Sequence, residues 1–568
     1  MKFSKMPYTR PDFEKTQAKL TEILEKLKKA ATSEECFAAY KEYDNESDYL
    51  YTMFSIANIR NTLDTTDDFY DKEKAYMDEV RPKLQALSQA FIQALLESPF
   101  RGDLEAKWGS LLFVNAEMEL KTFSPEIVPD LQEENKLKSE YSKLIASAQI
   151  EFDGKTLTLA QIRPYYEYPD PAIRKSAMDT ASAWYLSNAE KLDGLFDELV
   201  QVRTKIAKKL GYETFTQLGY NRMQRNCYNQ AVVAKFREGV VKHIVPVAMR
   251  LKAEQADRIG LKSEKIKIYD DFFEHPDGNA KPTGTPDDIF AHGKKMYHEL
   301  SKETAEFIDF MLENELFDVL TRPGKAAGGY CSYLPIYKSP FIFANFNGTS
   351  GDIDVLTHEA GHAFAAYLAR DIYPSALADY SYETAEVHSM AMEFFTWPWM
   401  EGFFGSQTQK YYYTHLSNAL TFIPYGTMVD EYQHHIYEKP GMSPKERNAL
   451  WLELENKYRP WLDLDDVPFF GEGRRWQSQG HIYSSPFYYI DYCLAQIMAL
   501  CFWAENQSNP ESAWAKYRRL LGFAGTKTFV ELIEDAGLPS PFVPDNLKIV
   551  ADAAVKWLDK HIKLRNTP

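Results

Sequence analysis

The stretch DVLTHEAGHAFAAYLAR, residues 354–370, contains two histidines four positions apart, with an acidic residue directly after the first. No proline interrupts the stretch and apolar side chains recur at helical spacing, so we predict a helix here. Residues i and i+4 of a helix share a face, so the imidazoles of His358 and His362 can converge on one cation. Glu359 lies about 100° around the helix from His358, where a carboxylate can reach a water on that cation without binding the cation itself. The spacing therefore predicts a metal site with its own general base.

A catalytic zinc ion takes three protein ligands and leaves a fourth position for water or substrate. The segment SYETAEVHSMAMEFFTWPWM, residues 381–400, is predicted to form a second helix, and it carries three carboxylates and one imidazole. We expect Glu386 to be the third ligand. Glu393 lies on the same face seven residues further on, and we expect it to orient the metal ligands without binding the metal itself. Glu383, His388 and Glu393 are the other candidates for the third ligand in this helix.

Two acidic residues precede the first histidine within its predicted helix. Asp354 lies one turn before His358 and could orient its ring, and Asp352 is the rival for this role. An acidic side chain in the first turn of a helix also stabilises the helix dipole, so a structural role is the alternative for both.

These segments resemble the M3 family of zinc metallopeptidases, the group of thimet oligopeptidase and oligoendopeptidase F. The resemblance rests on NGTSGDIDVLTHEAGH, residues 347–362, and on TAEVHSMAMEFF, residues 384–395. In that family a helical HExGH supplies two zinc ligands and the catalytic glutamate, and a glutamate on a downstream helix is the third ligand. Glu386, 24 residues after His362, has this place. The family usually has a further histidine where this chain has Ala365, which we interpret as the mark of a subfamily.

A second match lies near the carboxyl end, in GHIYSSPFYYIDYCLAQ, residues 480–496. It is similar to the histidine-rich and tyrosine-rich segment of the same family. The resemblance implies that His481 and one tyrosine donate hydrogen bonds to the tetrahedral intermediate of peptide hydrolysis. The candidate tyrosines are Tyr488, Tyr489 and Tyr492. A core position on an amphipathic helix is the alternative for at least one of them.

The remaining sequence is predicted to be mainly helical, with amphipathic helices over residues 12–31 and 66–96. A hairpin is predicted around Asp153, which precedes a glycine, and a strand-rich region over residues 328–352 leads into the helix of the two histidines. The fold class that we expect is mainly α, with zincin-type catalytic helices and a small β-sheet beside the active site. The resemblance adds two helical lobes that enclose a deep substrate channel.

We divide the chain into three approximate parts. Residues 1–110 form an N-terminal helical region, residues 111–200 form a helical region with the short hairpin, and residues 201–568 form the catalytic domain. The resemblance to the M3 family covers most of residues 110–560.

The strand segment before the two histidines is the predicted place for substrate. An extended peptide could add a β-strand beside it, held by backbone hydrogen bonds. The predicted substrate-binding residues are Phe343, Asn345, Asn347 and Gly348. The glycine would allow the peptide backbone to approach closely.

Composition limits the possible partners. The chain has 568 residues and a net charge of −17, with no cluster of Lys and Arg dense enough for nucleic acid or an anionic membrane surface. No stretch is long and apolar enough for a membrane span or a signal sequence. The five cysteines are scattered and never form a CxxC pair, which disfavours a cysteine metal site. We therefore expect a cytoplasmic protein without nucleic acid, membrane or obligate protein partners.

A second pair of histidines, His434 and His435, stands in EYQHHIYEKPG. Adjacent residues on a helix point in different directions, so these imidazoles cannot face one cation. We interpret them as part of a solvated helix surface.

Together these patterns predict a zinc-dependent endopeptidase with one Zn²⁺ per chain, which hydrolyses internal bonds of short oligopeptides with Glu359 as general base. A zinc carboxypeptidase of related helical fold is one alternative. The other is a non-catalytic helical protein that binds peptides and whose metal site is structural or lost.

Overall fold

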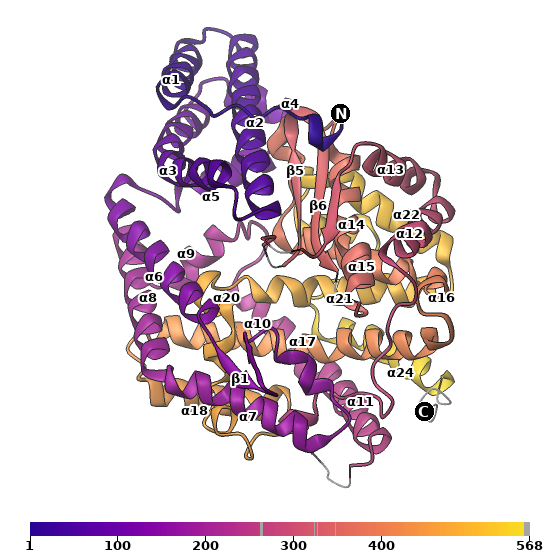
Figure 1. Cartoon of the computed structure of the whole chain (residues 1–568). Coiled ribbons are helices and arrows are strands. Elements are labelled where there is room, and N and C mark those ends of the chain that lie inside the picture. The colour runs from indigo at the N-terminus through magenta and orange to yellow at the C-terminus, as the bar shows by residue number, and fades with distance from the viewer. Residues whose placement is uncertain (262–264, 323, 327, 347, 562–568) are drawn as a thin grey trace. The chain divides into compact units, whose positions relative to one another are not determined.

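The structure is a computed structural model of the whole chain (Figure 1). It describes residues 1–261, 265–322, 324–326, 328–346 and 348–561, and the statements below concern these residues. Most of them lie in α-helices, and the strands form three small sheets of two or three strands each. The predicted mainly α fold is confirmed. The enclosed channel depends on how separate parts of the chain are placed, and it stays a prediction.

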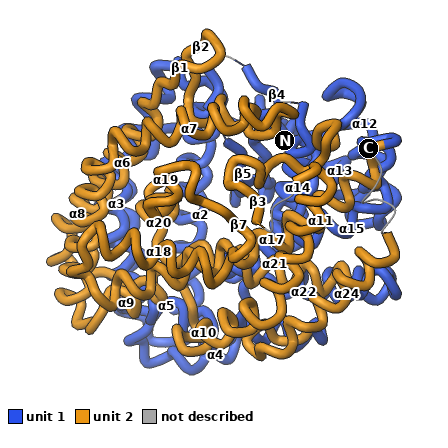
Figure 2. Tube along the Cα trace, turned by 90° about the horizontal axis from the view of Figure 1, so that it is seen from below, with its two compact units in different colours: residues 1–121, 281–406, 505–538 blue, residues 122–280, 407–504, 539–568 orange. Residues whose placement is uncertain are grey.

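The chain forms two compact units, each assembled from three separate segments (Figure 2). Unit 1 contains residues 1–121, 281–406 and 505–538. Unit 2 contains residues 122–280, 407–504 and 539–568. The predicted division of the sequence at residues 110 and 200 stays a prediction.

Unit 1 consists of helices and one three-stranded sheet. Its helices are α1 (Phe13–Lys29), α2 (Ser33–Leu63), α3 (Asp68–Leu96), α4 (Arg101–Trp108), α5 (Leu111–Leu120), α12 (Pro286–Leu300), α13 (Lys302–Glu313), α14 (Gly351–Ala369), α15 (Tyr382–Phe395), α16 (Glu401–Phe404), α22 (Pro510–Phe523) and α23 (Phe529–Asp535). Its strands are β4 (Phe317–Leu320), β5 (Tyr330–Leu334) and β6 (Ser339–Phe346).

The first helices of unit 1 begin where the sequence places N-cap residues. The Asp12 carboxylate accepts the backbone N–H of Lys15 at 3.1 Å, and the Thr32 hydroxyl accepts that of Glu35 at 3.2 Å. Both bonds satisfy amides that the first helical turn leaves without an intrahelical partner. The buried faces of α1, α2 and α3 then pack together around Ile23 and Phe91. The two predicted helices over residues 12–31 and 66–96 are confirmed.

The sheet of unit 1 has the strand order β4-β6-β5. β6 is the central strand, parallel to β4 and antiparallel to β5. Phe343 of β6 therefore has a partner on each side, Asp318 in β4 and Tyr330 in β5. Both edges of β6 are therefore paired, and β4 and β5 are the outer strands of this sheet.

A turn at residues 348–350 leads into α14. Gly348 has a positive φ of 83°, which favours glycine, and its N–H donates to the Asp352 carboxylate at 2.7 Å. Asp352 is buried in the first turn of α14, where a carboxylate also stabilises the positive end of the helix dipole. From this turn α14 runs back along β6 and β5 and packs against α15 (Figure 1).

Unit 2 is mainly helical and holds two pairs of short strands. Its helices are α6 (Val128–Ala146), α7 (Pro171–Ser187), α8 (Ala189–Lys209), α9 (Phe215–Arg222), α10 (Gln230–Gly239), α11 (Val245–Arg258), α17 (Thr408–Glu438), α18 (Pro444–Tyr458), α19 (Pro468–Gly471), α20 (Gly480–Ser484), α21 (Tyr489–Asn506, which ends in unit 1) and α24 (Leu547–Lys560). Its strands are β1 (Ile150–Phe152), β2 (Lys155–Leu157), β3 (Ile266–Lys267) and β7 (Leu462–Asp463). The β1-β2 pair is the predicted hairpin, with Asp153 at its turn.

One buried arginine connects four helices of unit 2. The guanidinium of Arg203, on α8, donates to the Glu134 carboxylate on α6 at 2.8 Å and to the Tyr437 hydroxyl on α17 at 2.9 Å. It also donates to the backbone carbonyls of Ile482 and Tyr483 on α20. The side chain is fully buried, so these bonds replace its hydration. They hold the α20 segment in place.

Within the described residues, no helix combines the length and the apolar character that a membrane span requires. The five cysteines all lie within the described residues and form no disulfide, and Cys36, Cys493 and Cys501 are buried.

We expect Arg203→Met to lower the free energy of unfolding by about 3–5 kcal/mol. The change removes one of the two arginines that pair with the buried Glu134 carboxylate, and it removes the donor to the Tyr437 hydroxyl and to the α20 carbonyls. Burial alone would raise the pKa of Glu134, but the charges of Arg203 and Arg222 hold it well below the ordinary value. The contribution of this pair is therefore complete above the unfolded pKa of about 4.3 and is lost as pH falls through the lower folded value.

Urea denaturation at neutral and acidic pH measures this effect, and the gap between wild type and Arg203→Met should shrink in acid. Lys136→Met is the matched control, since Lys136 is exposed on α6 and forms only surface ion pairs. If Arg203→Met unfolds at the same urea concentration as wild type at neutral pH, the buried pair of Arg203 and Glu134 does not stabilise the fold.

Candidate functional site

The two histidines of α14 and one glutamate of α15 converge in unit 1. The Glu386 Oε2 atom lies 3.4 Å from the His358 Nε2 atom and 3.7 Å from the His362 Nε2 atom. One ligand atom from each residue lies within 4.8 Å of the others, and this is the one such group of metal-ligating side chains among the described residues. The structure therefore brings together the three residues predicted to bind metal.

Gly361 allows the two helices to approach closely enough for this convergence. A Cβ atom at position 361 would lie 2.6 Å from the His388 carbonyl oxygen and 2.7 Å from the Ser389 Cα atom. Both atoms belong to the backbone of α15, so they cannot move without the helix. Only a residue without a side chain fits here.

The neighbouring polar groups fix the three side chains. The His358 Nδ1 atom lies 2.7 Å from the Glu393 carboxylate. A carboxylate only accepts, so Nδ1 carries a proton, and Nε2 is the ring nitrogen that faces Glu386. The Ser389 hydroxyl donates to Glu386, at 3.1 Å to Oε2. Such contacts set the direction and basicity of metal ligands. The orienting role predicted for Asp354, in the first turn of α14, stays a prediction.

The charges around the histidines favour a cation. Burial alone would lower the pKa of His358, but hydrogen bonds with Glu386 and Glu393 raise it well above its ordinary value. Burial lowers the pKa of His362 to about 4, which keeps that imidazole neutral. A positive charge between these side chains is therefore stabilised, and a neutral imidazole is available as a ligand.

Glu359 follows His358 on α14 and lies half-buried next to the same group. Burial raises the pKa of Glu359 to about 7, and the carboxylates of Glu386 and Glu393 add to this effect while His358 opposes it. A carboxyl group with such a pKa can take up and release a proton near neutral pH, as a general base must. Perturbed carboxylates of this kind are concentrated at functional sites.

The β5 side of the sheet faces Glu359. A Cβ atom at position 329 would lie 3.9 Å from the Glu359 Oε1 atom, so the backbone of Gly329, just before β5, passes beside the carboxylate. Burial raises the pKa of the Cys331 thiol well above its ordinary value, and the charge of Glu359 adds to the effect. Neither residue stood out in the sequence, because nothing local shows which strand is nearest to α14.

The predicted strand addition beside Phe343 is wrong, because β6 is the central strand and has no free edge. Phe343 itself is fully buried and stacks on Tyr330, with ring centroids 4.9 Å apart. The Asn345 amide donates to the carbonyls of Ala326 and Gly328, both at 2.9 Å, and so fastens the segment that leads into β5.

The other two predicted substrate residues follow β6. The N–H of Gly348 binds Asp352, so this glycine shapes the turn before α14. Asn347 lies outside the described residues.

His481 and the three candidate tyrosines form an aromatic cluster in unit 2. The His481 ring centroid lies 5.9 Å from that of Tyr488, 4.9 Å from that of Tyr489 and 6.0 Å from that of Tyr492. The Nδ1 atom of His481 is bound by the Gln479 amide at 3.0 Å. The structure thus brings these four predicted residues together. Their role toward substrate stays a prediction.

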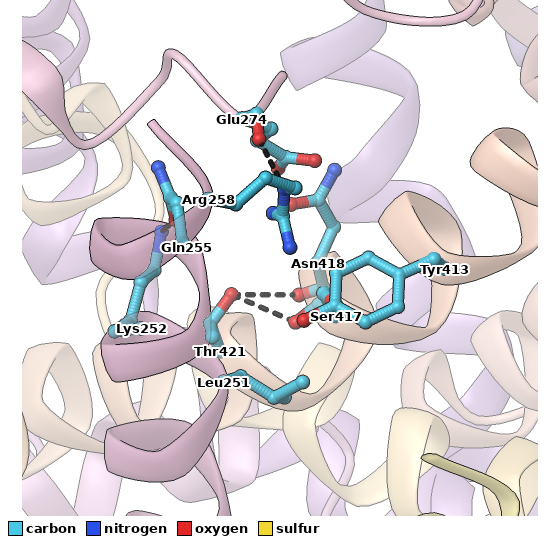
Figure 3. A pocket seen from close by; sticks show the side chains of 9 residues that line it. All are labelled: Leu251, Lys252, Gln255, Arg258, Glu274, Tyr413, Ser417, Asn418 and Thr421. Atoms are coloured by element: carbon cyan, nitrogen blue, oxygen red, sulfur yellow. Dashed lines mark hydrogen bonds between the residues drawn. The ribbon is translucent and has the colours of Figure 1, made fainter. Parts of the chain in front are cut away.

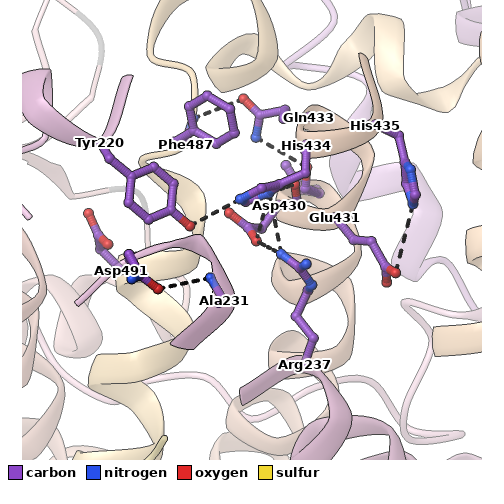
Figure 4. A network of polar contacts seen from close by, with 12 residues as sticks. Tyr220, Ala231, Arg237, Asp430, Glu431, Gln433, His434, His435, Phe487 and Asp491 are labelled. Atoms are coloured by element: carbon purple, nitrogen blue, oxygen red, sulfur yellow. Dashed lines mark hydrogen bonds and ion pairs between the residues drawn. The ribbon is translucent and has the colours of Figure 1, made fainter. Parts of the chain in front are cut away.

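The second histidine pair of the sequence separates into two environments (Figure 4). His434 is buried, with its Nε2 atom 3.0 Å from the Tyr220 hydroxyl, and it lies beside Asp430, which pairs with Arg237 at 2.8 Å. The predicted solvated surface is wrong for His434, because it faces α9 and α10 across the interior of unit 2. His435 is half-buried, 3.9 Å from Glu431.

A small cavity in unit 2 lies between α11 and α17 (Figure 3). It is lined by residues that include Arg258, Glu274 and Tyr413 and has a volume of about 10 Å³. This is room for about one water molecule, so the cavity is too small for a peptide or a cofactor.

Comparison with known families matches nearly the whole chain. Residues 3–123 match the family described as Peptidase M3 N-terminal domain, and residues 165–550 match Peptidase family M3. The chain therefore belongs to peptidase family M3, and the predicted family is confirmed.

Individual relatives agree with this assignment. The Group B oligopeptidase PepB of Streptococcus agalactiae serotype III (strain NEM316) is 22% identical over 526 residues, which cover 88% of this chain and 80% of PepB. The solved structure of PZ peptidase A with an inhibitor is 48% identical, with a TM-score of 0.93 over 98% of this chain and 99% of that one. A candidate oligoendopeptidase F from Bacillus anthracis str. Ames is 46% identical, with a TM-score of 0.89 over 100% of this chain and 99% of that one. The protein is a peptidase.

Gly361→Ala should destabilise unit 1 by about 1–3 kcal/mol and weaken the binding of a divalent metal ion, because the added methyl group pushes α15 away from α14. Thermal unfolding and a metal titration of the same sample measure both effects.

Gly194→Ala is the matched control, because a Cβ at this position of α8 meets nothing within 4 Å. The control should keep metal affinity and gain about 0.5–1 kcal/mol in the helix. Unchanged metal affinity in Gly361→Ala would show that the close approach at this glycine is not required.

Proposed function

We propose that this protein is a zinc-dependent endopeptidase that hydrolyses internal bonds of short oligopeptides. The observation that carries the proposal is the convergence of His358, His362 and Glu386, with the Glu359 carboxylate beside them. In a metal-dependent hydrolase three ligands and one adjacent base are the parts required of the protein.

The donor set fits zinc. Two imidazole nitrogens and one carboxylate oxygen are a common catalytic set for this ion. Ligand atoms about 2.0–2.2 Å from a tetrahedral ion lie roughly 3.3–3.5 Å apart. The separations of 3.4 Å and 3.7 Å between the Glu386 oxygen and the two imidazole nitrogens are close to these values. We propose one Zn²⁺ per chain, bound by these three residues.

The chain supplies the proton transfers. A zinc ion held by His358, His362 and Glu386 would polarise a carbonyl oxygen and lower the pKa of a water toward 7. Glu359 takes the proton of the attacking water at its carboxylate and passes it to the nitrogen of the leaving amine. Glu393 keeps the Nδ1 proton on His358 throughout, so that Nε2 stays available as a ligand.

Substrate is proposed to lie along β5. Its outer edge has no strand partner among the described residues, and the chain just before it passes beside Glu359. An extended peptide that pairs with a strand edge is held by its backbone, and the bond to be cut then lies near the carboxylate. This mode of binding does not require a free end of the peptide, which favours endopeptidase activity.

His481 and one of the three clustered tyrosines are proposed to stabilise the oxyanion of the tetrahedral intermediate. The support is the family resemblance of this segment and the gathering of one imidazole with three phenols. Hydrogen-bond donors of this kind contribute a factor of about 10²–10³ in kcat.

The two alternatives make different demands on the site. A carboxypeptidase would require a free carboxylate on its substrate. A non-catalytic peptide-binding protein would have no use for a carboxyl group with a raised pKa next to the metal ligands, and the environment of Glu359 therefore favours catalysis.

Glu359→Gln should keep one zinc per chain and lose cleavage of a peptide blocked at both ends, by a factor of at least about 10², because the amide cannot take the proton of water. Fluorescence of an internally quenched peptide measures cleavage, and elemental analysis of the same sample measures zinc.

The blocked peptide also separates the alternatives. Cleavage by wild type requires attack on an internal bond, whereas a carboxypeptidase would leave the peptide intact. Glu401→Gln, at an exposed position of α16, is the control for the chemical change and should keep full activity. A zinc-loaded Glu359→Gln variant with wild-type activity would remove Glu359 from the mechanism.

Glu393→Gln should weaken zinc binding by about 10–100-fold, because the amide holds the His358 ring less firmly than a carboxylate does. Competition with a coloured chelator measures the zinc affinity. If Glu393→Gln and Glu401→Gln bind zinc equally well, the hydrogen bond at Nδ1 has no part in metal binding.

A further inference from the structure

Gln479 links His481 to a tyrosine of α17. The Tyr425 hydroxyl donates to the Gln479 Oε1 atom at 2.7 Å, and the Gln479 Nε2 atom lies 3.0 Å from the His481 Nδ1 atom. All three side chains are half-buried in unit 2. The Gln479 amide therefore forms one hydrogen bond through its oxygen, to Tyr425, and one through its nitrogen, to His481.

The Tyr425 hydroxyl donates in this chain of hydrogen bonds, and two arginines beside its ring favour that direction. The guanidinium groups of Arg475 and Arg459 lie 4.5 Å and 4.9 Å from the centroid of its ring. Positive charge near an aromatic ring withdraws electron density from it and makes a phenol a better donor and a poorer acceptor. The hydroxyl consequently donates, and Gln479 presents its carbonyl oxygen to Tyr425.

With its oxygen on Tyr425, Gln479 presents its NH₂ group to His481. An amide nitrogen only donates, so the His481 Nδ1 atom must accept and cannot carry a proton. A neutral imidazole holds one proton, which is then on Nε2. Burial lowers the pKa of His481, which also favours the neutral ring.

We propose that Gln479 is a positioning residue that fixes His481 as the neutral tautomer with its proton on Nε2. The proposal deepens the proposed function, on which it rests for the catalytic consequence only. A donor at Nε2 is what stabilisation of an oxyanion requires, and the other tautomer would present a lone pair there. Neither Tyr425 nor Gln479 needs to touch substrate for this effect.

The ring ¹⁵N signals of selectively labelled histidine report the tautomer directly. We expect the His481 Nδ1 signal to be that of an unprotonated nitrogen and the Nε2 signal to be that of a protonated one. The chain has twelve histidines, so the His481 signals are assigned by their loss in His481→Asn. This reading uses the full-length protein and does not depend on any peptidase activity.

Gln479→Glu reverses only one of the two bonds. A carboxylate still accepts from Tyr425, but it also accepts from the ring and so draws the proton of His481 to Nδ1. It also raises the pKa of His481, because an opposite charge favours imidazolium. The other groups that face the ring are the phenols of Tyr488, Tyr489 and Tyr492.

The variant should therefore show a protonated Nδ1 at every pH and should lose the Nε2 proton above the raised pKa. Its kcat on the quenched peptide should equal that of wild type at low pH and fall by about 10²-fold as pH rises through that value. A merely structural role of Gln479 would lower activity by the same factor at all pH values.

Gln132→Glu adds the same charge on an exposed face of α6 in unit 2 and is the matched control. It should change neither the tautomer nor the pH profile. A neutral His481 ring with its proton on Nδ1 in wild type, or an unprotonated Nδ1 in Gln479→Glu, would overturn the inference.

The NMR spectrum and the activity measurement test separate parts of the proposal. If wild type has no peptidase activity, the proposed function is wrong and the tautomer reading still decides the role of Gln479. If Gln479→Glu has the shifted proton but a wild-type pH profile of kcat, the catalytic part of the inference is wrong while the peptidase remains.

Discussion

The approach of α14 and α15 at Gly361 is the constraint on which the site depends. The ligands come from two helices, and their atoms meet only if the helix backbones nearly touch. Position 361 has no space for a side chain, since the backbone of α15 at His388 and Ser389 occupies it. One residue without a Cβ thus sets the distance between two imidazoles and the carboxylate that completes the group. The position of the reactive side chains thus depends on a glycine that takes no part in the chemistry.

The site also depends on how charge is distributed around the two helices. Glu386 and Glu393 approach His358 at its two ring nitrogens, and Glu359 lies half-buried beside them. Without a cation these carboxylates repel one another, and burial adds to the cost. A divalent ion reverses the sign of this interaction. The same groups therefore disfavour an empty site and favour a filled one.

The sequence was sufficient for the parts of the site that depend on short-range geometry. His358, Glu359 and His362 lie within little more than one helical turn, and Glu386 and Glu393 share a face of the next helix, so their spacing indicated a common site. The family resemblance supported Glu386 as the third ligand. Strand order and burial depend on contacts between distant segments. For that reason the sequence could not show that β6 is central or that His434 is buried. Gln479 was missed because glutamine has no pattern that distinguishes an orienting amide from a surface one.

His358 and His481 show how one protein prepares the same side chain for opposite tasks. A carboxylate accepts a hydrogen bond from the Nδ1–H of His358, so Nε2 is the nitrogen that can bind a metal ion. An amide donates to the Nδ1 atom of His481, which in our proposal leaves a proton on Nε2, the form that binds an oxyanion. Glutamate and glutamine have nearly the same shape. They differ in one heavy atom, which is an oxygen that accepts a hydrogen bond in glutamate and a nitrogen that donates one in glutamine. In both histidines the hydrogen-bond partner of Nδ1 therefore determines what Nε2 can bind.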